Sequence, residues 1–168
     1  VRRHGFPISP GGLTNECQPP TNPYWKGAIV TKQVHEGTIY GPNGKKWSGK
    51  VTGHHCAVEL LEETFKELKR VSPELYVLMG TAGMLCVRHV RGAPGILSNH
   101  GLGMAIDLTI AGKLDRRGDN MVQRGMLGVY QTFKKFGWYW GVEFGTEDSM
   151  HMEASKNVVD RWIREKRL

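Results

Sequence analysis

A chain of 168 residues is long enough to bury one hydrophobic core, and its 39% hydrophobic and 23% charged residues exclude a disordered or fibrous chain. The formal net charge of +7 favours an anionic partner, such as a nucleic acid, a membrane surface or an acidic cell-wall polymer. Because the basic residues are scattered and no nucleic-acid-binding motif is present, the cell wall ranks above nucleic acid. No apolar run is long enough to span a membrane and no signal peptide is visible, so we expect one monomeric domain, 1–168, without membrane insertion.

The three cysteines, Cys17, Cys56 and Cys86, lie far apart and form no CxxC pair, so a cysteine zinc site is not expected. An odd number of cysteines excludes complete disulfide pairing. One bridge, for instance between Cys17 and Cys56, is compatible with the sequence, which does not decide the partners. For Cys86, within the apolar run MLCV, we expect the role of a buried small hydrophobic residue.

Residues 1–50 are rich in Pro, Gly, Asn and Thr and predict a loop- and hairpin-rich N-terminal arm with no clear linker after it. Pro-Asn-Gly between Tyr40 and Lys45 predicts a hairpin turn. A helix is expected from about His54 and to end before Pro73. It is indicated by apolar residues at helical spacing: Ala57, Leu60, Leu61, Phe65, Leu68 and Val71.

The remaining pattern alternates short strands with two helices. Residues 76–90 predict one or two strands interrupted near Gly80 and Gly83, 91–97 a Gly/Pro loop, and 105–110 a strand. A second helix is expected to start near Asp119 or Asn120 and to end at a left-handed Gly137. Strands at 138–144 and 149–155 and a helix over 156–168 complete an α+β domain, in which helices flank a small, mainly antiparallel sheet.

The segment SNHGLGMAIDLTI, 98–110, places an imidazole and a carboxylate at the two ends of a tight turn and strand. Gly101 and Gly103 allow the chain to turn back sharply between His100 and Asp107. Ala105 shares the strand face of Asp107 and is small enough to leave space beside it, and Ser98 is placed to brace the turn. This geometry suits two ligands of a divalent metal, although a lone histidine in a turn often serves only the backbone.

A third ligand has to come from another part of the chain. His151 is the best candidate, because it begins a predicted strand and follows an acidic cluster. Asp148, three residues earlier, is expected to accept a proton from the hydrolytic water and to pass it to the leaving amine. Glu153 is expected to brace the site. Trp138 and Trp140 are compatible with either a substrate groove or the core.

Two motifs carry a resemblance to a known family. Ser98-x-His100-x-x-Gly103-x-Ala105-x-Asp107 resembles the SxHxxGxAxD signature of the M15 peptidases, and Asp148-x-x-His151-x-Glu153 resembles their second motif, in which an acid precedes the last zinc histidine by three residues. The segment FKKFGWYWG, 133–141, is similar to the approach to that motif. The resemblance covers about residues 55–155.

The resemblance implies that zinc is held by His100, Asp107 and His151, with Asp148 as the general base. In CVRHVRG, Arg88 fits the arginine that binds the substrate or stabilises the oxyanion, with Arg91 as the alternative; a surface ion pair is the simpler role for Arg88. The sequence departs from the family at position 152, where Met replaces a frequent aromatic residue. Asp148 replaces the glutamate of the dipeptidases, which favours the branch of the phage endolysins.

By the same resemblance, the expected function is hydrolysis of peptidoglycan stem or cross-bridge peptides, by an L-alanyl-D-glutamate endopeptidase or a D-Ala-D-Ala carboxypeptidase. The expected place of action is the cell wall, on the extracellular or periplasmic side, with release at lysis if the enzyme is phage-encoded. The alternatives are a non-enzymatic zinc module of the same fold and, on charge alone, a nucleic-acid-binding domain. His54 and His55 are expected to be solvated at a helix start, and Arg117-Gly118-Asp119 to match an adhesion tripeptide by chance.

Overall fold

The computed structural model describes residues 4–36, 39–40 and 46–168. Its centre is a five-stranded antiparallel sheet with the order β10–β11–β8–β5, in which β9 also pairs with β8. These strands are β5 (Met79–Gly83), β8 (Ala105–Ile110), β9 (Lys113–Leu114), β10 (Trp138–Trp140) and β11 (His151–Ala154). The structure therefore confirms the predicted α+β class, with a mainly antiparallel sheet flanked by helices.

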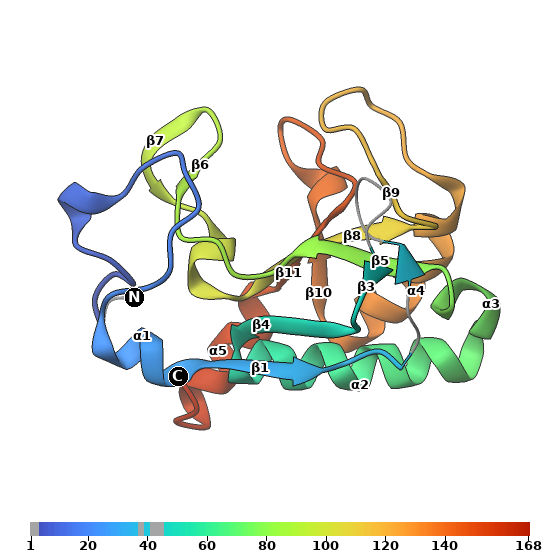
Figure 1. The fold of residues 1–168 in the computed structure, drawn as a ribbon, viewed down its shortest axis with the longest axis horizontal. Coiled ribbons are helices and arrows are strands. Elements are labelled where there is room, and N and C mark those ends of the chain that lie inside the picture. Colours follow the sequence, from blue (N-terminus) through green and yellow to red (C-terminus); the bar gives the residue numbers. More distant parts are fainter. Residues whose placement is uncertain (1–3, 37–38, 41–45) are drawn as a thin grey trace.

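Two long helices cover one face of this sheet. Figure 1 shows α2 running beneath the strands, whereas the β6–β7 hairpin and the loops near β9 rise on the other side. Along β8, Ile106 and Leu108 are buried in the same hydrophobic core as Phe65 of α2 and Phe133 of α4. The helices are α1 (Pro23–Ala28), α2 (His55–Val71), α3 (Pro73–Tyr76), α4 (Arg124–Phe136) and α5 (Lys156–Arg164).

The pairing register assigns a different chemistry to each face of the sheet. Met152 of β11 lies opposite Ile106 of β8, and both are fully buried in the core. One position along, His151 lies opposite Asp107, so these side chains emerge on the other face. Strand alternation thus separates an apolar face, packed on helices, from a polar face covered by loops.

The N-terminal residues contribute to the core. Strands β1 (Ile29–Gln33) and β4 (Lys50–His54) pair antiparallel, and β4 leads directly into α2. Strands β2 (Ile39–Tyr40) and β3 (Lys46–Trp47) pair as a predicted hairpin requires, while its turn, 41–45, lies outside the described residues. Trp25, Trp47 and Val51 are buried in the cluster that includes the apolar side chains of α2.

Several predicted boundaries are confirmed and others are wrong. The helix before Pro73 and the strand at 105–110 have the expected limits, and Gly137 ends α4 with φ 88°. Helix α4 begins at Arg124, not near Asp119, because carboxylates hold 115–123 as a loop: Asp115 accepts from the backbone N–H of Gln123, and Asp119 from that of Met121. Helix α5 ends at Arg164 and does not continue to 168.

The loop predicted for 91–97 is wrong. Strands β6 (His89–Val90) and β7 (Ala93–Leu97) form a short antiparallel hairpin whose turn is Arg91–Gly92. Gly95 adopts φ 87°, and a short strand at the edge of the molecule tolerates Pro94. The strand predicted over 138–144 is shorter than expected, since β10 ends at Trp140 and a 3-10 turn (Gly141–Glu143) follows. Trp138 and Trp140 lie in the core and do not line the cavity.

The cysteine expectations are corrected by a disulfide between Cys17 and Cys86, whose Cα atoms are 4.9 Å apart. The N-terminal segment runs beside the chain that follows β5, where Gln18 and Val87 exchange two backbone hydrogen bonds. This approach of distant segments makes Cys86 a bridge partner and leaves Cys56 as a buried free thiol. Within the described residues, no helix combines the length and apolar character that crossing a bilayer requires.

Candidate metal centre

His100 is positioned by a 3-10 turn, Asn99–Leu102, between β7 and β8. The Ser98 hydroxyl accepts the backbone N–H of His100 at 3.3 Å, as expected for a residue that braces this turn. Gly103 closes the turn with φ 64°, and a Cβ at this position would lie 2.5 Å from the backbone nitrogen of His54. Glycine is therefore required here by both its backbone angle and the close approach of β4.

Three side chains converge on one point of the polar face of the sheet. His100 Nε2 lies 3.1 Å from Asp107 Oδ1 and 3.2 Å from His151 Nδ1, and the latter lies 3.2 Å from the same Asp107 oxygen. Two donors at bonding distance from one tetrahedral zinc ion are about 3.3 Å apart, so these three atoms have the spacing of a ligand set. Both imidazoles are buried, at 3% and 6% exposure.

The outer nitrogen of each imidazole already has a partner. His100 Nδ1 donates to the Met84 carbonyl at 2.9 Å, and His151 Nε2 donates to Glu153 Oε2 at 2.9 Å. Because the outer nitrogens carry the protons, the neutral rings turn their lone pairs inward, toward the Asp107 carboxylate. Three electron-pair donors that face one another need a cation or a proton between them. Glu153 thus braces the site, as expected.

The pKa values reflect the same arrangement. Burial raises the pKa of Asp107, but hydrogen bonds with His100 and His151 outweigh it and hold the pKa below its usual range. Burial lowers the pKa of His151, but hydrogen bonds with Asp107 and Glu153 outweigh it and raise the pKa to about 9. Without a metal ion, a proton therefore takes the place of the cation.

Asp148 lies at the edge of the same cavity. Its Oδ2 lies 3.4 Å from Arg117 Nε, while its buried Oδ1 has no hydrogen-bond partner among the described residues. Burial, and next the charge of Asp107, raise the pKa of Asp148. A carboxylate with one free oxygen and a raised pKa is suited to accept a proton from an attacking water.

Gly141 permits the close approach of Asp148 and His151, a role that no local sequence pattern indicates. A Cβ at position 141 would lie 2.4 Å from the Asp148 carbonyl oxygen and 3.0 Å from His151 Cβ. The Gly141 carbonyl also accepts the backbone N–H of Asp148 at 3.0 Å. The second glycine of the GWYWG stretch therefore fixes the distance between the acid and the last histidine.

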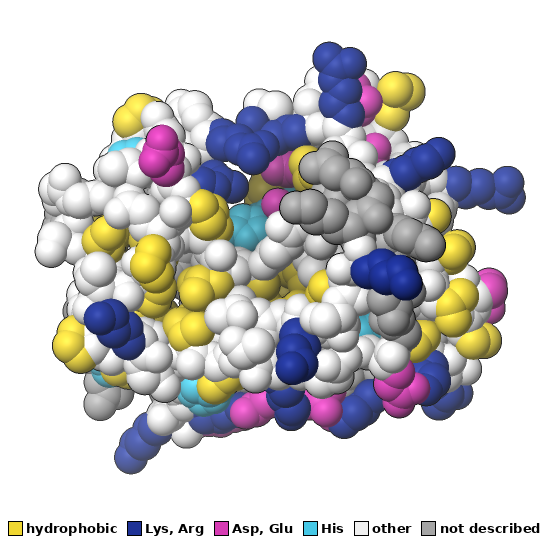
Figure 2. Space-filling model, in the orientation of Figure 1, with side chains coloured by type: hydrophobic (Ala, Val, Ile, Leu, Met, Phe, Trp, Pro, Cys, Tyr) yellow, Lys and Arg dark blue, Asp and Glu magenta, His cyan; other side chains and the backbone are white. Residues whose placement is uncertain are grey.

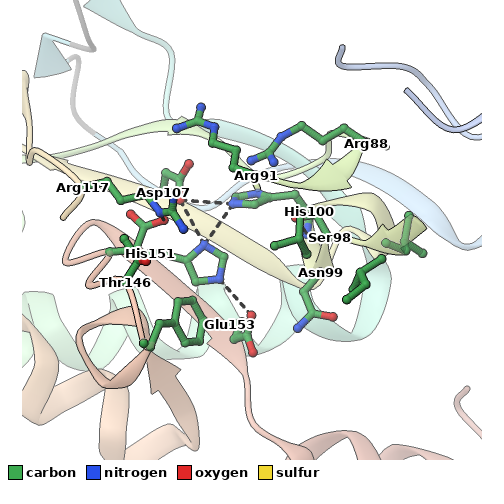
Figure 3. Close-up of a pocket in the computed structure, with 16 residues that line it drawn as sticks. Arg88, Arg91, Ser98, Asn99, His100, Asp107, Arg117, Thr146, His151 and Glu153 are labelled. Atoms are coloured by element: carbon green, nitrogen blue, oxygen red, sulfur yellow. Dashed lines mark hydrogen bonds and ion pairs between the residues drawn. The ribbon is translucent and has the colours of Figure 1, made fainter. Parts of the chain in front are cut away.

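A cavity of about 570 Å³ opens in front of the triad. Figure 2 shows it as a hollow with histidine and acidic side chains inside and basic side chains along its upper rim. Arg88, Arg91 and Arg117 line it, together with apolar side chains that include Ile96 and Phe144. Figure 3 shows Arg88 and Arg91 over His100, and Arg117 on the other side of Asp107.

Arg88 lines this cavity. Its guanidinium donates to the His89 carbonyl at 2.9 Å, and no carboxylate forms an ion pair with it in the part of the chain that the structure describes. Burial, and next the charge of Arg91, lower the pKa of Arg88. Arg117 also lines the cavity, which the sequence does not predict, because this residue only precedes the helix expected from about Asp119 and carries no motif of its own.

The expectation that His54 is solvated is wrong. His54 is fully buried, and its Nδ1 accepts the backbone N–H of Cys56, which caps the N-terminus of α2. With His55 and Cys56 it forms a second cluster whose potential ligand atoms lie within 4.8 Å of one another. The Cys56 thiol donates to the Arg167 carbonyl at 3.6 Å, so two members of this cluster already serve the backbone.

These features define a candidate metal centre of the hydrolytic class. It consists of two buried imidazoles and a carboxylate on one face of the sheet, with a second carboxylate beside them and an open cavity in front. Residues 91–154 match the model of an M15 peptidase family described as D-alanyl-D-alanine carboxypeptidase. The resemblance to the M15 peptidases that the two motifs predict is therefore confirmed over this segment. The match includes the triad and Asp148, whereas Arg88 precedes it. No curated protein matched the chain.

Proposed function

We propose that this protein is a zinc peptidase that hydrolyses peptide bonds of peptidoglycan, as an L-alanyl-D-glutamate endopeptidase or a D-Ala-D-Ala carboxypeptidase. The observation that carries the proposal is the convergence of three inward lone pairs, from His100, Asp107 and His151, within 3.2 Å of one another. Their outer contacts with Met84 and Glu153 fix this donor set before any ion arrives. The family match supports the reaction class.

The donor set of two nitrogens and one carboxylate oxygen fits zinc and leaves the cavity side open. When bound, zinc would lower the pKa of a water molecule and polarise the scissile carbonyl. Asp148 Oδ1, which is free of protein partners, accepts the proton of the attacking water and delivers it to the leaving amine. Arg88, from the cavity wall, binds the carbonyl oxygen as it becomes negative, or a substrate carboxylate.

We place this activity at the cell wall, on the extracellular or periplasmic side, in a monomeric enzyme. The Cys17–Cys86 disulfide fits an oxidising compartment, and the net charge of +7 favours association with an anionic wall. That attraction weakens as salt screens the charges.

The test is digestion of purified sacculi by the zinc-loaded protein, with mass spectrometry of the released muropeptides. Chelation abolishes the release of peptides and added zinc restores it, and the mass of the products identifies the cleaved bond. Release that survives complete removal of metal contradicts the proposal. A zinc-loaded protein that binds sacculi without turnover supports the alternative of a non-enzymatic module, against which the free Asp148 oxygen in the cavity argues.

A further inference from the structure

Arg117 differs from the other arginines of the cavity because, among the described residues, it has a carboxylate partner. Its Nε lies 3.4 Å from Asp148 Oδ2, and both side chains are partly buried, at 30% and 17% exposure. In the same part of the chain, the Arg88 guanidinium donates only to the His89 carbonyl. Figure 3 shows Arg117 apart from Arg88, on the other side of Asp107. Arg88 is therefore available to a substrate, whereas Arg117 is engaged with the proposed proton acceptor.

The backbone of Asp148 is held on both sides. Its N–H donates to the Gly141 carbonyl at 3.0 Å, and its carbonyl accepts the N–H of His151 at 3.0 Å. The side chain has further torsion angles, which these backbone contacts do not fix. Within the described residues, Arg117 forms an ion pair with Oδ2 of this carboxylate, while Oδ1 has no partner. The orientation of the free oxygen therefore depends on the guanidinium.

The loop that carries Arg117, between β9 and α4, is anchored to the segment that carries Asp148. The Glu147 carboxylate accepts the backbone N–H of Gly118 at 3.1 Å and that of Ser149 at 2.6 Å, and Gly118 also donates to the Glu147 carbonyl at 2.9 Å. Glu147 is buried, at 9% exposure. Because Arg117 precedes Gly118 and Asp148 follows Glu147, these bonds set the ion pair in place before a substrate binds.

We propose that Arg117 is a positioning residue for Asp148, which holds one carboxylate oxygen and thereby keeps the other available to the attacking water. This inference rests on the proposed function, in which Asp148 accepts the proton of that water. It separates two arginines of the cavity by role, because Arg88 acts on the substrate and Arg117 acts only through Asp148. Loss of the Arg117 guanidinium therefore slows the chemical step and leaves substrate binding unchanged.

The first test separates the effects on kcat and on KM. The substrate is a synthetic stem peptide that contains an L-Ala–D-Glu bond and a C-terminal D-Ala-D-Ala pair. With the zinc-loaded protein, we expect Arg117→Gln to lower kcat about 10- to 100-fold with little change in KM. Arg117→Lys restores part of kcat, because an ammonium group can replace the single contact through Nε. Arg116→Gln, at an exposed position of the same loop, keeps the wild-type values. A rise in KM without a fall in kcat would show that Arg117 binds the substrate instead.

A double-mutant cycle gives a sharper test. If Arg117 acts only through Asp148, Arg117→Gln has no further effect on kcat in an Asp148→Asn background. A general structural loss would lower kcat by the same factor in both backgrounds, so additive effects overturn the proposal. Circular dichroism and zinc content establish that each variant is folded and loaded with metal.

Another measurement does not depend on turnover. In the metal-free protein, NMR three-bond couplings of the Asp148 β-protons report whether its side chain occupies a single rotamer. We expect a single rotamer in the wild type and in Arg117→Lys, and averaging between rotamers in Arg117→Gln. Averaged couplings in the wild type, or a single rotamer retained in Arg117→Gln, overturn the proposal. If the zinc-loaded wild type cleaves no peptide, the proposed function fails, while the couplings still decide whether Arg117 positions Asp148.

Discussion

The described residues contain two clusters of potential metal ligands, and each cluster includes a buried imidazole. In the first, His100 and His151 have outer nitrogens that donate to a carbonyl and a carboxylate, so both lone pairs turn toward Asp107. In the second, the Nδ1 lone pair of His54 accepts a backbone N–H of α2. Proximity alone therefore does not make a metal site, because the hydrogen-bond partners of the outer nitrogens decide where the lone pairs of the rings point.

The largest effect on zinc binding and on hydrolysis is expected when a ligand of the first cluster is removed. His151→Ala leaves two ligands, so zinc binding is expected to weaken by at least about 100-fold and hydrolysis by about 1,000-fold or more. Zinc content after dialysis and the rate of muropeptide release measure both effects. A variant that keeps full zinc and full activity contradicts the triad.

The next largest effect is expected at Asp148 and distinguishes metal binding from proton transfer. Asp148→Asn keeps the three ligands but removes the proton acceptor, so the variant is expected to retain zinc while kcat falls about 10²- to 10⁴-fold. Glu63→Gln, a change at an exposed acid of α2, serves as the control and leaves both quantities as in the wild type. Full activity of Asp148→Asn would remove this residue from the mechanism.

A smaller effect is expected at the outer partner of His151. Glu153→Gln removes the charge that orients the ring and holds its proton, which is expected to weaken zinc binding about 10- to 100-fold. Competition with a chromophoric chelator measures the affinity, and excess zinc should restore most of the turnover. If affinity is unchanged, the carboxylate does not control the direction of the lone pair.

The buried histidines of the two clusters are also expected to have pKa values shifted in opposite directions. The pKa of His151 is raised to about 9 in the metal-free protein, so below that pH a proton competes with zinc, and affinity should fall about tenfold for each pH unit. Burial, helped by the charges of His55 and Arg167, lowers the pKa of His54 to about 4, so this ring stays neutral through the same range. NMR titration of the metal-free protein tests both assignments. A His151 that titrates near 6.5 contradicts the coupling with Asp107 and Glu153.

The smallest effect on function is expected in the second cluster. His54→Ala removes the cap of α2 and should lower the free energy of unfolding by about 1 kcal/mol or more, whereas His54→Asn restores a capping acceptor. Both variants are expected to bind one equivalent of zinc, the same number that we expect for the wild type. A second equivalent that the wild type binds and His54→Ala loses would show that both clusters hold metal.

The parts of this molecule that the sequence predicts are those encoded by local pattern. The apolar spacing of 55–71 predicts α2, and the short turn between His100 and Asp107 predicts that both side chains meet. His151 could be placed because it follows Asp148 by three residues at the start of a strand. Each of these inferences depends on residues within one or two neighbouring elements.

The features that could not be predicted depend on segments far apart in the chain. Cys86 pairs with Cys17 because the N-terminal segment runs beside 86–89, which no spacing rule indicates. Arg117 reaches the site because Glu147 ties two loops together across 29 residues. Similarly, the need for Gly141 is visible only once the carbonyl of Asp148 lies against it.

The register between β8 and β11 has a further consequence. His151 faces Asp107, and the adjacent pair, Met152 and Ile106, fills the core. A slip of one residue between these strands would present Met152 to the cavity and drive an imidazole into the apolar layer. A misaligned chain would therefore lose the candidate metal centre and the packed core together. Activity is thus expected only from molecules in which these two strands pair in the native register.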